Sequence, residues 1–176
     1  MTTQLLFAGF GGQGLLFSGK FMAYAGLLDG LQVSWLPSYG PEMKGGTANC
    51  SVILSDTPIG SPVVLEPDIL VAMNLPSFSR FAPLVKAGGL LIADSSMFSE
   101  TCDRDDIQAW YLPATQMASD EGLNGLANMI LMGKLLKETN LIKPETVKAA
   151  MNKTVPPRKT ALLEGNLRAI EMGLGL

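Results

Sequence analysis

The stretch QLLFAGFGGQG, residues 4–14, decides the fold of this chain. Residues 4–8 form a short apolar run that breaks at Gly9, as a buried parallel strand does. Gly9, Gly11 and Gly14 have the spacing G-x-G-x-x-G, and Gly12 is an additional glycine within it. A turn of this kind between a strand and a helix exposes backbone amides at the helix N-terminus, where they favour a bound anion.

The residues that follow the turn predict a βαβ unit. Apolar residues recur at three- and four-residue intervals from Gln13 to about Leu28, which predicts a helix packed on a sheet. Residues 32–36 are β-branched and aromatic and stop at Pro37, so they predict a second strand. The next connection, PSYGPEMKGG, is too rich in proline and glycine to hold a crossover helix. The strand expected over residues 47–55 should therefore run antiparallel to the second strand.

The rest of the chain predicts a second βαβ unit and a helical C-terminal third. The expected elements are strands at 68–73, 89–94 and 107–114, a helix at 76–88 stopped by Gly88 and Gly89, and helices at 115–120, 124–138, 144–153 and 157–172. The predicted fold class is α/β: a three-layer sandwich with a mostly parallel, Rossmann-like sheet and one antiparallel strand. No long linker divides the chain, so we expect residues 1–176 to form a single domain.

Composition and charge exclude several classes of function. With 13 basic and 16 acidic side chains, the net charge of -3 gives no general attraction to nucleic acid or to an anionic membrane. No run of 18 apolar residues and no basic segment before the N-terminal apolar stretch is present, so we expect a cytoplasmic location. Only 16% of the residues are charged, which fits either apolar surface covered by partner chains or a sheet buried on both faces.

The chain lacks the side chains that usually perform redox or metal chemistry. It has no histidine and only two cysteines, Cys50 and Cys102, which are far apart in the sequence. Such a set holds neither a standard zinc site nor an iron–sulfur cluster, and the thiols are expected to be reduced. We therefore expect no metal site and no catalytic residue on this polypeptide.

The glycine motif by itself has two interpretations of about equal weight. A dinucleotide site needs an acidic residue at the end of the second strand to bind the ribose, and Leu36, Pro37 and Ser38 stand at that place. The motif then either binds another phosphate-bearing ligand through its amides or makes only a sharp turn.

A second glycine-rich loop follows the second predicted strand. Since both loops follow the carboxyl ends of strands that are expected to be adjacent, they should lie side by side. In this loop Lys44 is the candidate cation, Glu42 the carboxylate, and Tyr39 an aromatic cover for a ring or a partner side chain. A hairpin turn with a solvated charge pair is the alternative.

The order of these motifs resembles the gamma subunits of 2-oxoacid:ferredoxin oxidoreductases, the family that acts on pyruvate, ketoisovalerate and 2-oxoglutarate. The motifs are GFGGQG (9–14), SYGPEMKGGTANCSVILSD (38–56), PDILVAMN (67–74), LVKAGGLLIADSS (84–96) and ANMILMGKL (127–135). The stretch WLPSYGPEMKGGTANC is most similar to the 2-oxoglutarate and branched-chain members, with Lys44 where many relatives carry arginine. The beta-type subunit of indolepyruvate oxidoreductase is a near alternative.

The resemblance implies a non-catalytic subunit of an enzyme that converts a 2-oxoacid and coenzyme A (CoA) to acyl-CoA and CO2 and passes two electrons to ferredoxin. Thiamine diphosphate and the iron–sulfur clusters would lie on partner subunits of the thiamine-binding, pyrimidine-domain and ferredoxin-like types. This chain would hold no cofactor alone but would contact CoA phosphates or a subunit interface. The candidate residues are Gly9, Gly11, Gly12, Gln13, Gly14, Ser38, Tyr39, Lys44, Gly45 and Gly46.

Within that set, the backbone amides of residues 11–14 are the expected anion donors and Lys44 is the expected point charge for phosphate. Two other functions stay open: a stand-alone nucleotide-binding oxidoreductase that uses the G-x-G-x-x-G turn, and a scaffold whose glycine loops are buried against partner chains. For Asp94 we expect a capping role, and for Asn128 a cap or an interface contact.

Overall fold

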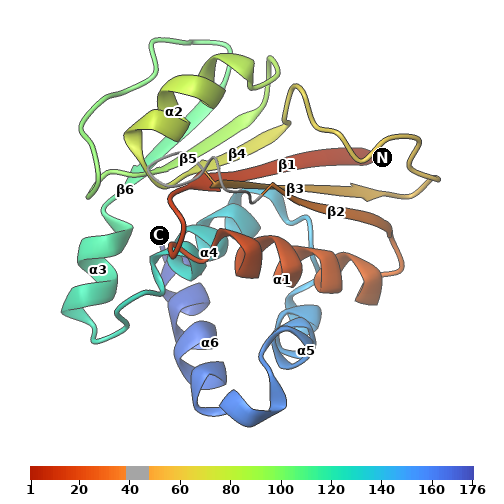
Figure 1. The fold of residues 1–176 in the computed structure, drawn as a ribbon, viewed down its shortest axis with the longest axis vertical. Coiled ribbons are helices and arrows are strands. Elements are labelled where there is room, and N and C mark those ends of the chain that lie inside the picture. Colours follow the sequence, from red (N-terminus) through yellow and green to blue (C-terminus); the bar gives the residue numbers. More distant parts are fainter. Residues whose placement is uncertain (39–47) are drawn as a thin grey trace.

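The computed structural model describes residues 1–38 and 48–176 of the chain. A six-stranded sheet in the order β2-β3-β1-β4-β5-β6 forms its centre (Figure 1). The strands are β1 (Thr2–Gly9), β2 (Gln32–Ser38), β3 (Ala48–Ser55), β4 (Ile69–Ala72), β5 (Leu90–Asp94) and β6 (Gln108–Leu112).

Helices follow β1, β4 and β6 and make up the C-terminal part of the chain. The α-helices are α1 (Leu15–Leu28), α2 (Leu75–Phe81), α3 (Ala114–Asp120), α4 (Ala127–Thr139), α5 (Pro144–Thr154) and α6 (Ala161–Leu174). Two short 3-10 helices, η2 (Ala82–Leu84) and η3 (Pro157–Lys159), extend α2 and precede α6.

The sheet is mixed, as the sequence predicts. Strands β1, β4, β5 and β6 pair in parallel, whereas β3 is antiparallel to both of its neighbours, β1 and β2. The connection between β2 and β3 contains no crossover helix in its sequence, and neighbouring strands joined in this way run antiparallel. The predicted α/β class with one antiparallel excursion is confirmed.

The strand order differs from the prediction in one respect. We expected β1 and β2 to be adjacent, but β3 lies between them and pairs with both along nearly its whole length. Its side chains are almost all buried, which suits an interior position, whereas β2 is partly exposed and contains Pro37. Proline removes a ladder hydrogen bond and is tolerated on an edge strand, so Pro37 was the signal in the sequence for this placement.

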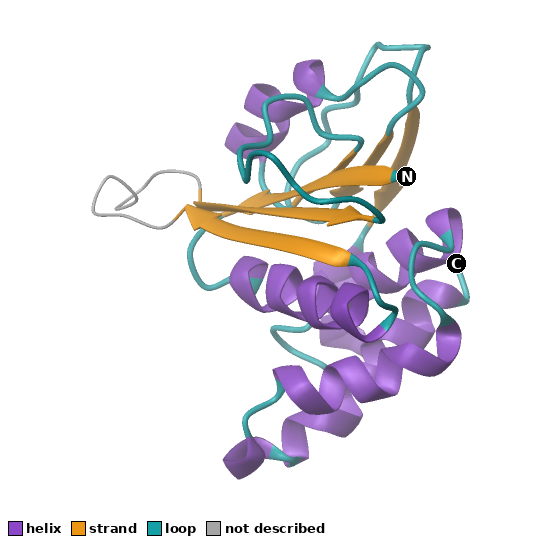
Figure 2. Cartoon of the chain, turned by 90° about the vertical axis from the view of Figure 1, so that its right-hand side faces the viewer, coloured by secondary structure: helices purple, strands orange, loops and turns teal. Residues whose placement is uncertain are grey.

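Helices cover both faces of the sheet, so the fold has the three layers seen in Figure 2. One face is covered more fully than the other. Alternate residues of β1 enter two separate cores: Leu5 and Phe7 pack with α1 and α4, whereas Leu6 and Ala8 pack with α2. This division explains why residues 5–8 are a continuous apolar run instead of an alternating one.

One predicted helix is shorter in the structure than in the sequence pattern. The helix expected at 76–88 consists of α2 and the single turn η2, after which Val85 is extended with ψ of 132°. Val85 is buried in the core under α2, so the chain leaves the helix early in order to place this side chain. Gly88 therefore lies in the connection to β5 rather than at a helix end.

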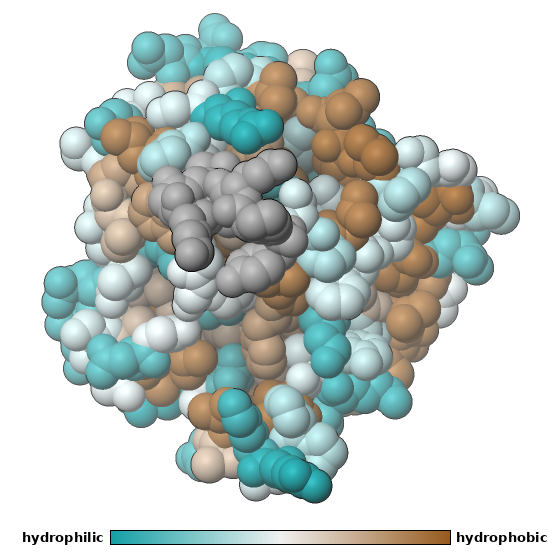
Figure 3. Space-filling view, in the orientation of Figure 1, coloured by the Kyte–Doolittle hydropathy of each residue, from teal (hydrophilic) through white to brown (hydrophobic). Residues whose placement is uncertain are grey.

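Large apolar side chains are exposed at several places on the surface, and two of these places are considered for contact with other chains. Leu27 and Leu28 are exposed at the end of α1, and Val63 and Leu65 are exposed in the loop between β3 and β4. Figure 3 shows apolar residues gathered over both regions. Within the described ranges, no helix combines the length and the hydropathy that a membrane crossing requires.

Candidate functional site

The candidate site is the loop of residues 10–14, which joins the end of β1 to the start of α1 at the carboxyl edge of the parallel strands. Gly12 has φ of 91° and Gly14 has φ of 78°. Side-chain-bearing residues rarely adopt this left-handed region, so the sharp turn depends on glycine at both positions. Helix α1 covers one face of the sheet and α2 the other, so the loop lies where the two crossover connections diverge (Figure 1).

The side chain of Gln13 braces this loop against the neighbouring strand. Its Oε1 accepts a hydrogen bond from the backbone amide of Phe10 at 2.6 Å, and its Nε2 donates to the carbonyl oxygen of Met73 at 2.9 Å. A Cβ on Gly9 would lie 2.5 Å from Gln13 Oε1, so Gly9 makes room for the brace. The loop is therefore fixed to the end of β4 by a side chain that belongs to the motif itself.

The backbone of the loop differs from the sequence prediction in one respect. The backbone amide of Gln13 was expected to donate to an anion, but it donates to the carbonyl oxygen of Phe10 at 3.3 Å. The amides of Gly11, Gly12 and Gly14, and those of Leu15 to Phe17, have no acceptor among the residues that the structure describes. Free amides at the start of a 14-residue helix are an arrangement that binds phosphate or carboxylate groups.

A second helix begins against the first turn of α1. Asn128, in the first turn of α4, donates from Nδ2 to the carbonyl oxygen of Gly14 at 3.1 Å and to Ser18 Oγ at 3.0 Å. Gly14 leaves room for this contact, because a Cβ there would lie 2.5 Å from Asn128 Nδ2. Because helix N-termini carry partial positive charge, the meeting of these two first turns adds to the attraction for an anion.

Further polar side chains follow β4 and β5 at the same edge of the sheet. Asn74 accepts a hydrogen bond from the amide of Ser77 and caps α2. Asp94 is fully buried and accepts hydrogen bonds from the amide of Ser96 and from the amide and hydroxyl of Thr115. Asp94 thus caps the turn after β5 and links it to α3, as expected from the sequence, and its carboxylate is occupied by protein donors.

Of the second glycine-rich loop, the structure describes only Pro37 and Ser38, the last residues of β2. Ser38 ends β2 opposite Asn49, and the start of β3 separates it from the end of β1. Tyr39, Lys44, Gly45 and Gly46 lie outside the described residues. The sequence prediction missed the brace by the Gln13 side chain and the contact of Asn128 with Gly14, and the partners of the second contact are 114 residues apart.

The geometry argues against a dinucleotide site of the usual kind. The residues that end β2 are Leu36, Pro37 and Ser38, none of which is acidic. In addition, β3 separates the end of β2 from the loop, whereas a ribose-binding acid stands on the strand next to the phosphate turn.

The thiols and acidic side chains of the described residues supply no metal centre. In residues 1–38 and 48–176 no three His, Cys, Asp or Glu side chains lie close enough together to share a metal ion. Burial raises the pKa of the Cys50 thiol to about 11, although Trp35 Nε1 donates a hydrogen bond to its sulfur at 2.9 Å. A thiol with this pKa is protonated at neutral pH and is a poor nucleophile.

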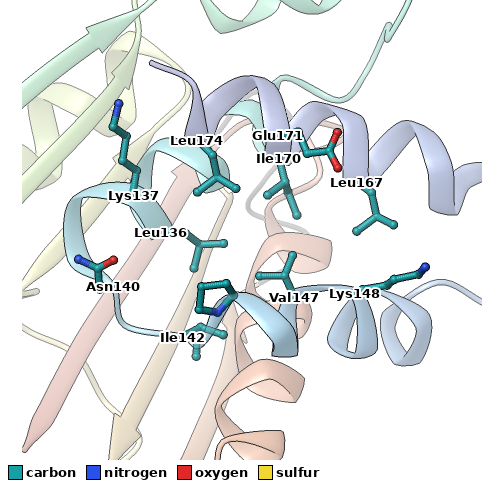
Figure 4. Close-up of a pocket in the computed structure, with 11 residues that line it drawn as sticks. Leu136, Lys137, Asn140, Ile142, Val147, Lys148, Leu167, Ile170, Glu171 and Leu174 are labelled. Carbon is teal, nitrogen blue, oxygen red and sulfur yellow. The ribbon is translucent and has the colours of Figure 1, made fainter.

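An apolar groove lies far from the loop, between α4, α5 and α6 (Figure 4). Its volume is about 500 Å³, and Leu136, Ile142, Val147 and Ile170 are among the residues that line it. It meets the C-terminal half of α4, whereas the loop meets the first turn of that helix. The groove is therefore separate from the candidate site.

Comparison with known proteins gives a match over nearly the whole chain. Residues 4–176 match the sequence profile of the family described as pyruvate ferredoxin/flavodoxin oxidoreductase. The 2-oxoglutarate synthase subunit KorC of Methanothermobacter marburgensis is 36% identical over 180 residues, which cover 98% of this chain and 95% of KorC. The ketoisovalerate oxidoreductase subunit VorA of the same organism is 35% identical over 167 residues, which cover 94% of this chain but 34% of VorA. This chain thus spans about a third of the length of VorA.

Two solved structures share the fold. The gamma subunit of a keto/oxoacid ferredoxin oxidoreductase from Geobacter sulfurreducens has a TM-score of 0.84 and 28% identity, covering 98% of this chain and 96% of that chain. The 2-oxoglutarate:ferredoxin oxidoreductase of Magnetococcus marinus, solved with 2-oxoglutarate, coenzyme A and succinyl-CoA bound, has a TM-score of 0.87 and 25% identity. That match covers 99% of this chain and 30% of the Magnetococcus chain.

Proposed function

We propose, because this chain belongs to the pyruvate ferredoxin/flavodoxin oxidoreductase family, that it is the gamma subunit of a multi-subunit 2-oxoacid:ferredoxin oxidoreductase. The observation that carries the proposal is the match to KorC over almost the full length of both chains. The complex would oxidise a 2-oxoacid with CoA to acyl-CoA and CO2. Relatives named for 2-oxoglutarate and for ketoisovalerate are similarly close, which supports a 2-oxoacid of the glutarate or branched-chain type as the substrate.

Partner subunits would carry the chemistry of the reaction. When bound there, thiamine diphosphate would supply the activation of the 2-oxoacid, and iron–sulfur clusters would supply the path for electrons to ferredoxin. The chain offers no histidine for general base catalysis, and its buried Cys50 is held in the unreactive thiol form. The exposed apolar side chains at the end of α1 and in the loop between β3 and β4 support contact with partner chains.

For the glycine loop we propose contact with the phosphates of CoA. The free amides of Gly11, Gly12, Gly14 and Leu15 support this role, because oriented N–H groups at a helix N-terminus bind phosphate without a side chain. Gln13 would hold the loop in shape through its contacts with Phe10 and Met73. Lys44 is the point charge that the sequence assigns to the same ligand.

Reconstitution tests the proposal directly. Co-expression with the thiamine-binding, pyrimidine-domain and ferredoxin-like subunits should give a stable complex that reduces ferredoxin only in the presence of CoA and a 2-oxoacid. Omission of this chain should abolish CoA-dependent reduction. A complex that keeps full activity without this chain would refute the assignment.

A Lys44→Ala variant of the same complex separates the CoA role from an assembly role. If Lys44 binds a phosphate, the Lys44→Ala substitution should raise the KM for CoA about ten-fold. This is the change expected when the binding free energy of one charge-assisted hydrogen bond is lost. Normal assembly with an unchanged KM for CoA would remove Lys44 from the site and leave the scaffold function standing. Equilibrium dialysis of the isolated chain with NAD, NADP and FAD tests the stand-alone alternative, which micromolar binding would revive.

A further inference from the structure

The side chain of Asn128 is buried, with 4% of its surface exposed, yet only one end of its amide is paired within the described residues. Nδ2 donates to the carbonyl oxygen of Gly14 and to Ser18 Oγ. Oδ1 has no hydrogen-bond partner in the part of the chain that the structure describes. The carbonyl oxygen of Gly14 can only accept, so the amide must face it with Nδ2, and Oδ1 is left over. An unpaired buried acceptor disfavours asparagine at this position unless Nδ2 performs a needed task.

Nδ2 of Asn128 is not needed to complete the hydrogen bonds of the first turn of α1. The carbonyl oxygen of Gly14 already accepts from the Ser18 amide at 2.9 Å and from the Ser18 hydroxyl at 3.2 Å. These two bonds complete the first turn of α1 without any help from α4. The donation from Asn128 is therefore an additional restraint on the same carbonyl group.

The restraint acts on the direction of one amide in the loop. A trans peptide unit is planar, with its C=O and N–H groups pointing in opposite directions. Fixing the carbonyl of Gly14 therefore fixes the N–H of Leu15, which points out of the helix at its N-terminal end. This N–H is one of the free donors of the candidate anion site.

We propose that Asn128 is a positioning residue of the CoA phosphate site: it clamps the Gly14–Leu15 peptide and thereby aims the Leu15 amide at the ligand. The inference rests on the function proposed above for the glycine loop. Asn128 itself does not touch the phosphate. The contact between Asn128 and Gly14 also accounts for the glycine at position 14, since any Cβ there would collide with the side-chain amide of Asn128.

The test uses the reconstituted complex with Asn128→Asp and Asn128→Ala in this chain. Aspartate keeps the shape of the side chain but replaces the donor with an acceptor that repels the Gly14 carbonyl. The KM and Kd for CoA should rise about three- to ten-fold, the worth of one hydrogen bond, while kcat at saturating CoA is unchanged. Aspartate also adds a charge near the anion site, so the alanine variant, which removes the donor without adding charge, must show the same rise for the positioning role to stand.

Asn166 supplies a matched control. It is also buried, its Nδ2 donates to the carbonyl oxygen of Leu162, and its Oδ1 has no partner in the described ranges. Asn166 lies on α6, so Asn166→Asp should lower the thermal midpoint and leave the KM for CoA unchanged. An equal rise of the KM for CoA in Asn128→Asp and Asn166→Asp would show a purely structural role for Asn128 and overturn the inference. Parallel changes of KM and kcat in Asn128→Asp would do the same.

A charge placed in the loop separates failure of the inference from failure of the proposed function. Gly11→Glu introduces a carboxylate into the exposed loop and leaves Asn128 unchanged. If Gly11→Glu weakens CoA binding and the Asn128 variants do not, the anion site stands and the positioning role is wrong. If Gly11→Glu leaves the Kd for CoA unchanged, the phosphate site itself is wrong, and the inference falls with it.

Discussion

Gly133 and Gly173 lie against each other where α4 crosses α6: a Cβ built on Gly133 would lie 2.8 Å from the Cα of Gly173 and 2.1 Å from the carbonyl oxygen of Ile170. The backbones of the two helices therefore touch at this crossing. The contact joins the helical C-terminal third to α4, whose first turn meets the candidate site. The position of α4 thus depends on the absence of two side chains.

We expect Gly133→Ala to lower the free energy of unfolding by roughly 1–3 kcal/mol, because the added methyl group separates the helices. Gly165→Ala on α6 is the matched control, since its Cβ would meet only the side chains of Leu126 and Leu123, at 3.3 and 3.8 Å. Alanine is the better helix former, so the control should be neutral or more stable by up to about 1 kcal/mol. Urea unfolding measures the free energy of unfolding of both variants. Equal stability of the two would contradict the close contact between the backbones of α4 and α6.

Lys134 is a buried cation with several partners. Its side chain is 2% exposed, and its Nζ lies 2.8 Å from Glu138 Oε1 and 3.6 Å from the centroid of the Trp110 ring. We expect Lys134→Met to lower the free energy of unfolding by roughly 2–4 kcal/mol, because Glu138 would lose its cation in a largely buried place. The double variant Lys134→Met/Glu138→Gln should regain part of this loss. Denaturant titration measures both, and a double variant no more stable than the single one would argue against the pair.

The same pair predicts a dependence of stability on pH. The hydrogen bond from Lys134 holds the pKa of Glu138 below its ordinary value. A carboxylate with a lowered pKa in the fold stabilises it above the unfolded value of about 4.3 and ceases to do so as the pH falls through the folded pKa. The thermal midpoint should therefore fall more steeply below about pH 4.3 in the parent chain than in Lys134→Met. Lys148→Met, on α5, is the control and should retain the parent slope.

The two cysteines should differ in reactivity. Burial raises the pKa of the Cys50 thiol to about 11, whereas Cys102 is partly exposed. Iodoacetamide at about pH 8 should therefore alkylate Cys102 in the folded chain and leave Cys50 unmodified, since the thiolate is the reactive form. Mass spectrometry of peptides from folded and urea-treated protein gives the comparison. Rapid labelling of Cys50 in the folded chain would show that the thiol is not buried as described.

Local signals in the sequence were sufficient for much of the fold. The apolar run before Gly9 and the glycine turn after it predicted β1 and the start of α1, because each depends on neighbouring residues alone. The proline- and glycine-rich connection after Pro37 predicted the antiparallel step from β2 to β3 for the same reason. Resemblance over the whole chain then identified the family, which the match over residues 4–176 confirms.

Long-range pairing was the part that the sequence pattern did not contain. The placement of β3 between β2 and β1 depends on which strands best fill the interior of the sheet, and only Pro37 hinted at it. The contact between Asn128 and Gly14 joins residues 114 positions apart, and nothing near either residue indicates the other. The early end of the helix at 76–88 likewise depends on a core that accepts Val85.

The most direct measurement of contact between the glycine loop and CoA is the affinity of the reconstituted complex for CoA with Gly11→Glu or Gly60→Glu in this chain. Both variants add one negative charge, but Gly60 lies in the loop after β3, at the opposite edge of the sheet, where a Cβ meets open space. A carboxylate close to a bound phosphate weakens binding by roughly 1.4–4 kcal/mol at the effective dielectric constant of a protein surface. The Kd for CoA should therefore be at least about ten-fold higher in Gly11→Glu and unchanged in Gly60→Glu. A Kd that is the same in both variants and in the parent complex would show that the glycine loop does not contact the CoA phosphates.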